Sequence, residues 1–98
     1  MPLHSDGATI VVVGPLDSRT LAGARDEVYR HVPDHDVVVD LSQCEWLDGA
    51  ALRMLVAATV LAQRGGHRVV LRGCVPRVRR LLHRTGAYPR LEIESQSA

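Results

Sequence analysis

The stretch "VVVDLSQCEWLDGAALRMLV", residues Val37 to Val56, decides the fold because it joins a predicted strand directly to a predicted helix. The strand, Asp36–Ser42, contains three consecutive valines and lacks the alternation of a half-exposed strand, which is typical of a strand buried on both faces of a parallel sheet. Asp48 then precedes an apolar run that stops at Gly65-Gly66. This pattern predicts a helix over Gly49–Arg64 with Asp48 as its N-cap.

The flanking sequence continues the alternation of strands and helices. The other predicted elements are a strand over Ala8–Gly14, a helix over 18–32, a strand over His67–Gly73, a helix over 76–86 and a strand over Arg90–Ser95. We expect Asp17 or Ser18 to cap the first of these helices, and Pro76 suits the first turn of the second. The order predicts one α/β domain over residues 1–98, with a four- to five-stranded, mostly parallel or mixed sheet and three to four helices.

Composition and charge narrow the classes of function. The apolar fraction of 46% is ordinary for a globular protein, and no apolar run approaches the roughly 18 residues that cross a bilayer, so we predict no membrane insertion. The start of the chain lacks the pattern of a secretory signal, which favours the cytoplasm. Residues 1–48 carry nine acids and three arginines, whereas residues 49–98 carry nine arginines and two acids. This asymmetry predicts either a basic face for an anionic partner or pairing between the two halves.

The motifs that usually mark catalysis or a bound cofactor do not occur. The sequence has no G-x-S-x-G, no G-x-x-x-x-G-K-[ST] and no G-x-G-x-x-G. His31 and His35 lie among aspartates in a Pro-containing turn, where polar residues are expected anyway, and a zinc site needs three or four converging ligands. We therefore predict no enzyme activity, no catalytic residue, no cofactor and no metal site.

The arginine-rich segment Arg77–Arg84 is the strongest signal for a nucleic-acid ligand. Val78, Leu81 and Leu82 supply an inward helix face and leave the arginines on an outward stripe. Neither helix-turn-helix spacing nor stacking aromatic residues accompany this stripe, so we predict a solvated helix face and no nucleic-acid partner.

The two cysteines each follow a predicted strand at its C-terminal end. If the two strands are neighbours, Cys44 and Cys74 could approach each other, although a disulfide needs Cα atoms about 5–6 Å apart. In a reducing cytosol the default is two buried free thiols. A redox pair formed by Cys44 and Cys74 stays open as an alternative.

The helix after Asp48 is apolar on two sides. Four residues fall on one side and are expected to meet the sheet: Leu52, Leu55, Val56 and Thr59. The opposite side is expected to carry Ala50, Met54 and Leu61, with Arg53, Ala57 and Arg64 nearby. In a domain this small a second covering layer is hard to supply, so this opposite side predicts a protein-binding face.

These segments together resemble the STAS domain, the family of bacterial anti-sigma factor antagonists and of the cytoplasmic tails of sulphate transporters. The family pattern is a strand ending in "DLS", a short turn, an apolar pair before Asp, and a helix rich in small residues, which here reads "VVVDLSQCEWLDGAALRMLVAA". The flanking segments "VVVGPLD", "RGGHRVVLRG" and "PRVRRLLHRTGAY" also agree with it. The resemblance covers roughly residues 8–94.

The resemblance implies that the helix from about Gly49 binds a partner. In the sigma-regulating members this partner is an anti-sigma factor with a histidine-kinase-like ATPase fold, which phosphorylates a Ser or Thr at the helix start and is thereby released. Asp48 matches the family aspartate, Gly49 the first hydroxyl residue, Ala50 the phosphoacceptor and Ala51 a glycine. Asp17 matches an acidic residue that lies near this helix start in the family.

No residue from Gly49 to Met54 carries a hydroxyl, so phosphorylation at the family site is chemically impossible. The partner-binding residues that we predict are Asp17, Asp48, Gly49, Ala50, Ala51, Arg53, Met54, Ala57 and Leu61.

Three readings follow from the resemblance. The first is an antagonist that always binds its anti-sigma factor or is controlled through expression or redox state. The second is an adaptor subunit on a transporter ATPase in lipid trafficking, since such members also lack the phosphoserine. The third is a nucleotide- or anion-binding module that uses the bare helix N-terminus. A homodimer is open in each case.

Overall fold

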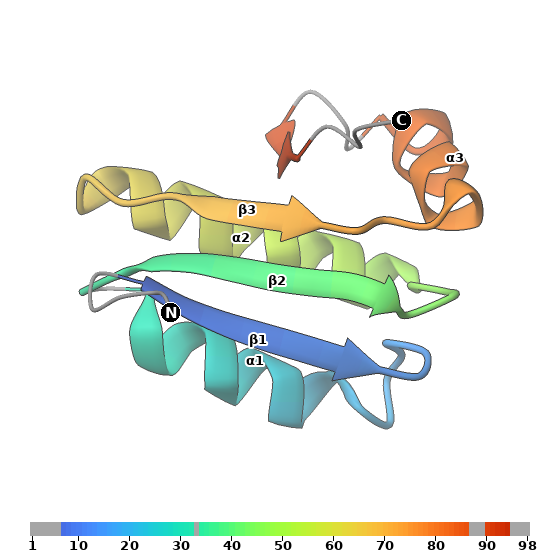
Figure 1. The fold of residues 1–98 in the computed structure, drawn as a ribbon, viewed down its shortest axis with the longest axis horizontal. Helices are drawn as coiled ribbons and strands as arrows, with labels where there is room; N and C mark the ends of the chain where they lie inside the picture. Colours follow the sequence, from blue (N-terminus) through green and yellow to red (C-terminus); the bar gives the residue numbers. More distant parts are fainter. Residues whose placement is uncertain (1–6, 33, 87–89, 95–98) are drawn as a thin grey trace.

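Four parallel strands, connected by helices, form the centre of the fold (Figure 1). The computed structural model describes residues 7–32, 34–86 and 90–94. The strands are β1 (Gly7–Val13), β2 (Asp36–Gln43), β3 (Val69–Arg72) and β4 (Glu92–Ile93). The helices are α1 (Leu21–His31), α2 (Gly49–Arg64) and α3 (Pro76–Arg84). The predicted α/β fold with a mostly parallel sheet is confirmed, with four strands and three helices in the described part.

The strands lie in sequence order, β1-β2-β3-β4, and each neighbouring pair is parallel. Right-handed connections in such an order place successive helices on the same face of the sheet. Figure 1 shows this arrangement, with α1 and α2 side by side behind the strands. The core therefore lies between the helices and one sheet face, which contributes Val12, Val37, Val39, Leu41, Val69 and Leu71.

The opposite face of the sheet, which we call the open face, is covered by no helix of the described residues (Figure 1). Side chains along β2 alternate between fully buried and partly exposed, and Val38 and Val70 are only half-buried. The prediction that β2 is buried on both faces is therefore wrong. The valine run is explained by strong burial on the helical side, together with partial shielding of the open face by neighbouring strands.

Helix α2 has the predicted bounds because its end signals are local. The Asp48 side chain accepts a hydrogen bond from the Ala51 backbone N at 2.9 Å, and Gly66 takes a positive φ just beyond the last turn. The predicted orientation is partly wrong, since Met54 is only 6% exposed and packs in the core. The buried arc of α2 consists of Ala51, Leu52, Met54, Leu55, Ala58, Thr59 and Ala62. It is wider than predicted because α1 packs alongside α2 and covers a second flank.

Helix α1 begins later than predicted, at Leu21, with Thr20 as its N-cap residue. Asp17 does not cap it, because its carboxylate accepts a hydrogen bond from the Arg19 backbone N at 2.9 Å and forms a separate turn. Thr20 Oγ1 accepts from the Asp17 backbone N at 3.1 Å and closes the same turn. The last two predicted strands are also shorter than expected, and Ser95 lies outside the described residues.

Among the described residues, few charges of the first half pair with charges of the second half, in contrast to one of the two predictions, although Arg72 acts on the Asp40 carboxylate. Within the described residues, arginines of the second half pair with acids of the same half, in Arg68–Glu92 and Arg72–Glu94. Between the halves, His67 Nδ1 lies 3.4 Å from Asp36 Oδ1. The arginines of α3 have no ion pair in the described part of the chain, so the second half keeps a basic surface.

Candidate functional site

The start of α2 lies at the C-terminal edge of the sheet, where ligand sites of parallel sheets usually form. Leu16, after β1, and Leu47, before α2, pair as an isolated parallel bridge. The Leu16 backbone N donates to the Trp46 carbonyl O at 2.9 Å, and the Asp48 backbone N donates to the Leu16 carbonyl O at 3.2 Å. These bonds place Asp17, the residue after Leu16, beside the start of α2.

Two acidic side chains therefore border the helix start. Asp48 caps α2, whereas Asp17 lies in the turn that precedes α1. The hydrogen bond from the Arg19 backbone N lowers the pKa of Asp17, with a smaller lowering from the Arg19 charge, so this carboxylate stays ionised over a wide pH range. The helix start carries negative charge near its capping residue.

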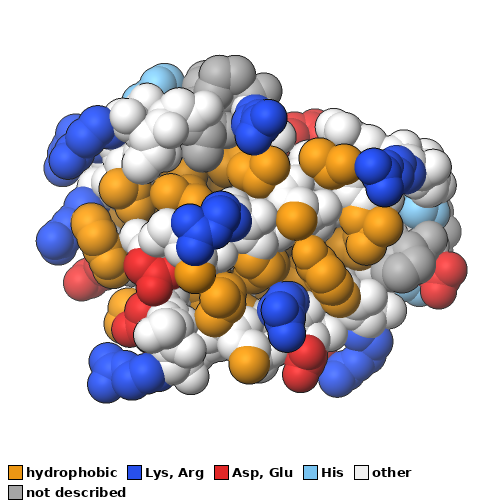
Figure 2. Space-filling view, turned by 180° about the vertical axis from the view of Figure 1, so that it is seen from behind, with side chains coloured by type: hydrophobic (Ala, Val, Ile, Leu, Met, Phe, Trp, Pro, Cys, Tyr) orange, Lys and Arg blue, Asp and Glu red, His pale blue; other side chains and the backbone are white. Residues whose placement is uncertain are grey.

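The outer face of α2, defined as its residues outside the buried arc, is small and apolar over much of its length. Of the predicted partner-binding residues, Gly49, Ala50, Arg53, Ala57 and Leu61 lie on it. Ala51 and Met54 belong to the buried arc, so their side chains do not reach its surface. Val60, 43% exposed beside Leu61 at 38%, was missed, although its helical position next to Ala57 could have revealed it. Hydrophobic side chains are visible over this side of the molecule, among separate basic ones (Figure 2).

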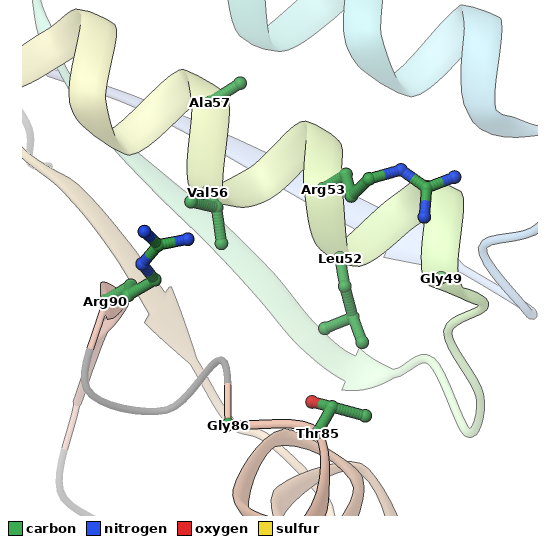
Figure 3. A pocket seen from close by; sticks show the side chains of 8 residues that line it. All are labelled: Gly49, Leu52, Arg53, Val56, Ala57, Thr85, Gly86 and Arg90. Atoms are coloured by element: carbon green, nitrogen blue, oxygen red, sulfur yellow. The ribbon is translucent and has the colours of Figure 1, made fainter.

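A groove of about 420 Å³ borders this outer face (Figure 3). Its α2 wall consists of Gly49, Leu52, Arg53, Val56 and Ala57, and its other wall of Thr85, Gly86 and Arg90. Leu52 points from α2 toward Thr85, and the Arg90 guanidinium points toward Val56 (Figure 3). Among the described lining residues are two arginines and no acid, so the groove combines an apolar floor with a basic rim.

Arg53 lies close to the helix start. A Cβ built on Gly49 would lie 3.5 Å from Arg53 Nη1, so the guanidinium extends over this glycine (Figure 3). The second wall of the groove, with Arg90, was missed by sequence reasoning because its residues are remote from α2 in the chain. The Thr85-Gly86 pair that follows α3 was the one sequence feature that could have indicated this wall.

A protein-family model described as "Mlab, STAS domain" matches residues 2–88 of the chain. The chain belongs to the STAS family. Among curated proteins, no relative with significant sequence similarity was found.

Solved structures with the same STAS fold include a sulfate transporter family protein and anti-sigma factor antagonists. A sulfate transporter family protein from Wolinella succinogenes is 14% identical, with a TM-score of 0.76 over 95% of this chain and 80% of that chain. The anti-sigma factor antagonist SpoIIAA in its unphosphorylated form is 13% identical, with a TM-score of 0.76 over 97% and 86%. A candidate anti-sigma factor antagonist from Thermotoga maritima is 17% identical, with a TM-score of 0.72 over 90% and 80%. At these identities the likeness shows a shared fold.

The two cysteines of this STAS domain are buried free thiols. The Cys44 thiol donates to the Trp46 carbonyl O at 3.3 Å, within the loop that leads to α2. Burial raises the pKa of Cys44, and burial raises the pKa of Cys74 to about 11. Both thiols are therefore protonated at neutral pH and are poor nucleophiles, and the redox pair stays a prediction.

The other predictions concern the histidine pair, the arginine-rich helix α3 and membrane insertion. The His31 and His35 rings lie 6.1 Å apart, and within the described ranges no group of three or more His, Cys, Asp or Glu side chains is placed to hold a metal ion. In α3, Val78 and Leu82 are buried as predicted, while the Arg77 guanidinium lies over the Trp46 ring at 5.3 Å. No helix in the described part of this STAS domain is long and apolar enough to cross a membrane.

Proposed function

We propose that this STAS domain is a non-enzymatic protein-interaction module that binds its partner through the outer face of α2 and the adjoining groove. The observation that carries this proposal is the exposure of Ala57, Val60 and Leu61 beside Arg53 on the helix that starts at the sheet edge. Apolar side chains exposed together beside an arginine are typical of a protein interface.

The partner that we propose is an anti-sigma factor with a histidine-kinase-like ATPase fold, which would place the protein in transcription regulation in the bacterial cytoplasm. The structural likeness to SpoIIAA and to the Thermotoga maritima protein supports this type of partner. Binding would occur without the phosphorylation switch, since the start of α2 carries Gly49 and Ala50. The single hydroxyl of α2 belongs to Thr59, which is 3% exposed and donates to the Leu55 carbonyl O at 2.8 Å.

A second candidate is an adaptor subunit of a transporter ATPase, which would use the same face. It is favoured by the match to the family model described as "Mlab, STAS domain" and by the likeness to a sulfate transporter family protein. A nucleotide- or anion-binding role has weaker support, because the Asp48 carboxylate already accepts from the Ala51 backbone N at the helix start and would repel an anion.

Calorimetric titration of the purified chain against the anti-sigma kinase and the transporter ATPase of its own genome tests this proposal. We expect Ala57→Glu and Leu61→Glu to weaken binding more than about tenfold, because each places a charge in the apolar interface. Ala22→Glu, on the exposed side of α1, is the matched control and should bind like the wild type. Unchanged binding of both α2 variants would rule out this face, and the partner that binds decides between the two candidates.

A further inference from the structure

The outer edge of β1 has no neighbouring strand in the described part of the chain. β1 stands first in the strand order and pairs only with β2. Edge strands of soluble monomers usually carry a charge, a proline or a bulge that prevents pairing with other chains. β1 reads "GATIVVV" and carries neither a charge nor a proline. Its pairing is irregular between Val11 and Val13, but the extra residue belongs to β2, so β1 itself keeps a regular edge.

Apolar side chains accompany this free edge. Val11 is 50% exposed and Val13 is 72% exposed, and both lie on the open face of the sheet. They are more exposed than Val60 and Leu61 on the outer face of α2. β1 thus presents unpaired backbone groups and apolar side chains on one strand.

The described residues also leave space beside this edge. A groove of about 230 Å³ runs along residues 10–13 of β1 and is bordered by the N-cap Thr20 and by Gly23, Ala24 and Glu27 of α1. A Cβ built on Gly23 would meet no atom within 4 Å. The small residues of α1 therefore leave room for another strand to approach β1.

The net charge around β1 is compatible with a second copy of this chain as the occupant. Residues 8–31, which form β1 and α1, carry three acids and three arginines, so two copies meet there without net repulsion. Residues 49–98 carry nine arginines and two acids, and two such surfaces would repel each other. A strand edge is self-complementary about a two-fold axis, and antiparallel pairing keeps Thr9, Val11 and Val13 on one face against the same residues of the copy.

We propose that the protein forms a homodimer by antiparallel pairing of β1 with β1 of a second copy, which joins two four-stranded sheets into one. The outer face of α2 and its groove remain free, because the groove includes Arg90 beside β4, at the opposite end of the strand order. The dimer and the proposed partner binding can therefore fail or succeed separately.

Analytical ultracentrifugation of the full chain over a dilution series tests the proposal. We expect a concentration-dependent species of twice the monomer mass for the wild type. Val11→Lys and Val13→Lys should each raise the dimer dissociation constant at least about tenfold, since each places two symmetry-related charges in the apolar row that the two copies share. Val60→Lys is the matched control, because Val60 is similarly exposed but lies on α2, and it should dimerise like the wild type.

A monomer at every concentration would overturn the proposal, and so would a dimer that survives both β1 changes. Amide hydrogen exchange gives a second readout. The amides of Val11 and Val13 point to the free edge, because N–H groups alternate along a strand and the Gly14 N–H bonds to β2. Their protection should increase with protein concentration in the wild type and should not increase in Val11→Lys. Equal protection at all concentrations would show that no second copy pairs with this edge, which also overturns the proposal.

Discussion

Leu16 and Leu47 form a parallel bridge outside the main sheet, and both side chains are almost completely buried. Backbone hydrogen bonds from Leu16 to Trp46 and from Asp48 to Leu16 continue on either side of the bridge. These hydrogen bonds fix the turn after β1 next to Asp48, the residue that caps α2. The position of the proposed docking helix depends on this pair as much as on its own sequence.

Replacing Leu47 by alanine should strongly destabilise the protein. We expect the free energy of unfolding to fall by about 2–5 kcal/mol, because the change leaves a cavity at a fully buried site. Urea unfolding followed by circular dichroism measures the loss. Leu61→Ala, on the exposed face of α2, should change stability by less than about 1 kcal/mol. Equal losses in the two variants would contradict the burial of the Leu47 side chain in the core.

Replacing the capping residue of α2 should have a smaller effect. Asp48→Ala removes the acceptor of the Ala51 backbone N–H, so we expect a loss of about 0.5–2 kcal/mol in the free energy of unfolding. Asp48→Asn keeps an acceptor oxygen and should recover most of the loss. If urea unfolding shows the two variants to be equally unstable, the hydrogen bond is not what Asp48 contributes.

Stability should depend on alkaline pH through Cys74. Burial raises the pKa of this thiol from its ordinary value of 9.0 to about 11. The unfolded chain then loses the proton at lower pH than the folded chain, so the stabilisation is complete below pH 9.0 and is lost as pH rises toward about 11. Urea unfolding across this range should show a steeper loss in the wild type than in Cys74→Ala. Parallel pH profiles would argue against the raised pKa.

Restoring a hydroxyl at the family position should restore the switch, if the partner is an anti-sigma kinase as proposed. Ala50→Ser should accept phosphate from that kinase, and the added charge near Asp48 should release the complex. Mass spectrometry measures the phosphate, and calorimetry measures binding before and after phosphorylation. Ala57→Ser, which places an exposed hydroxyl about two turns from the helix start, should remain unmodified. Phosphate on the wild-type chain would show that the switch lies at another residue.

The sequence predicts α2 well because its signals are local. Asp48 and Gly65-Gly66 mark its ends by side-chain capping and by backbone conformation, and neither depends on the rest of the fold. The β-α order predicts the parallel sheet for a similar reason, since short connections allow few arrangements.

Features that depend on how several elements pack together could not be predicted from local sequence signals. The burial of Met54 requires knowing that α1 lies alongside α2, and the exposure of Val13 requires knowing that β1 is an edge strand. The groove needs Arg90, which only the path of the chain after α3 brings near α2. These facts follow from strand order, which no single segment encodes.

The buried hydroxyl of Thr59 has a consequence for signalling under the proposed function. Because the one hydroxyl of α2 is bonded to the Leu55 carbonyl and shielded, the helix itself offers no phosphoacceptor to a kinase. Without a switch on α2, occupancy of the partner follows the relative amounts of the two proteins. Such a protein acts as a titrant: the fraction of partner that it binds changes gradually with its own rates of synthesis and degradation.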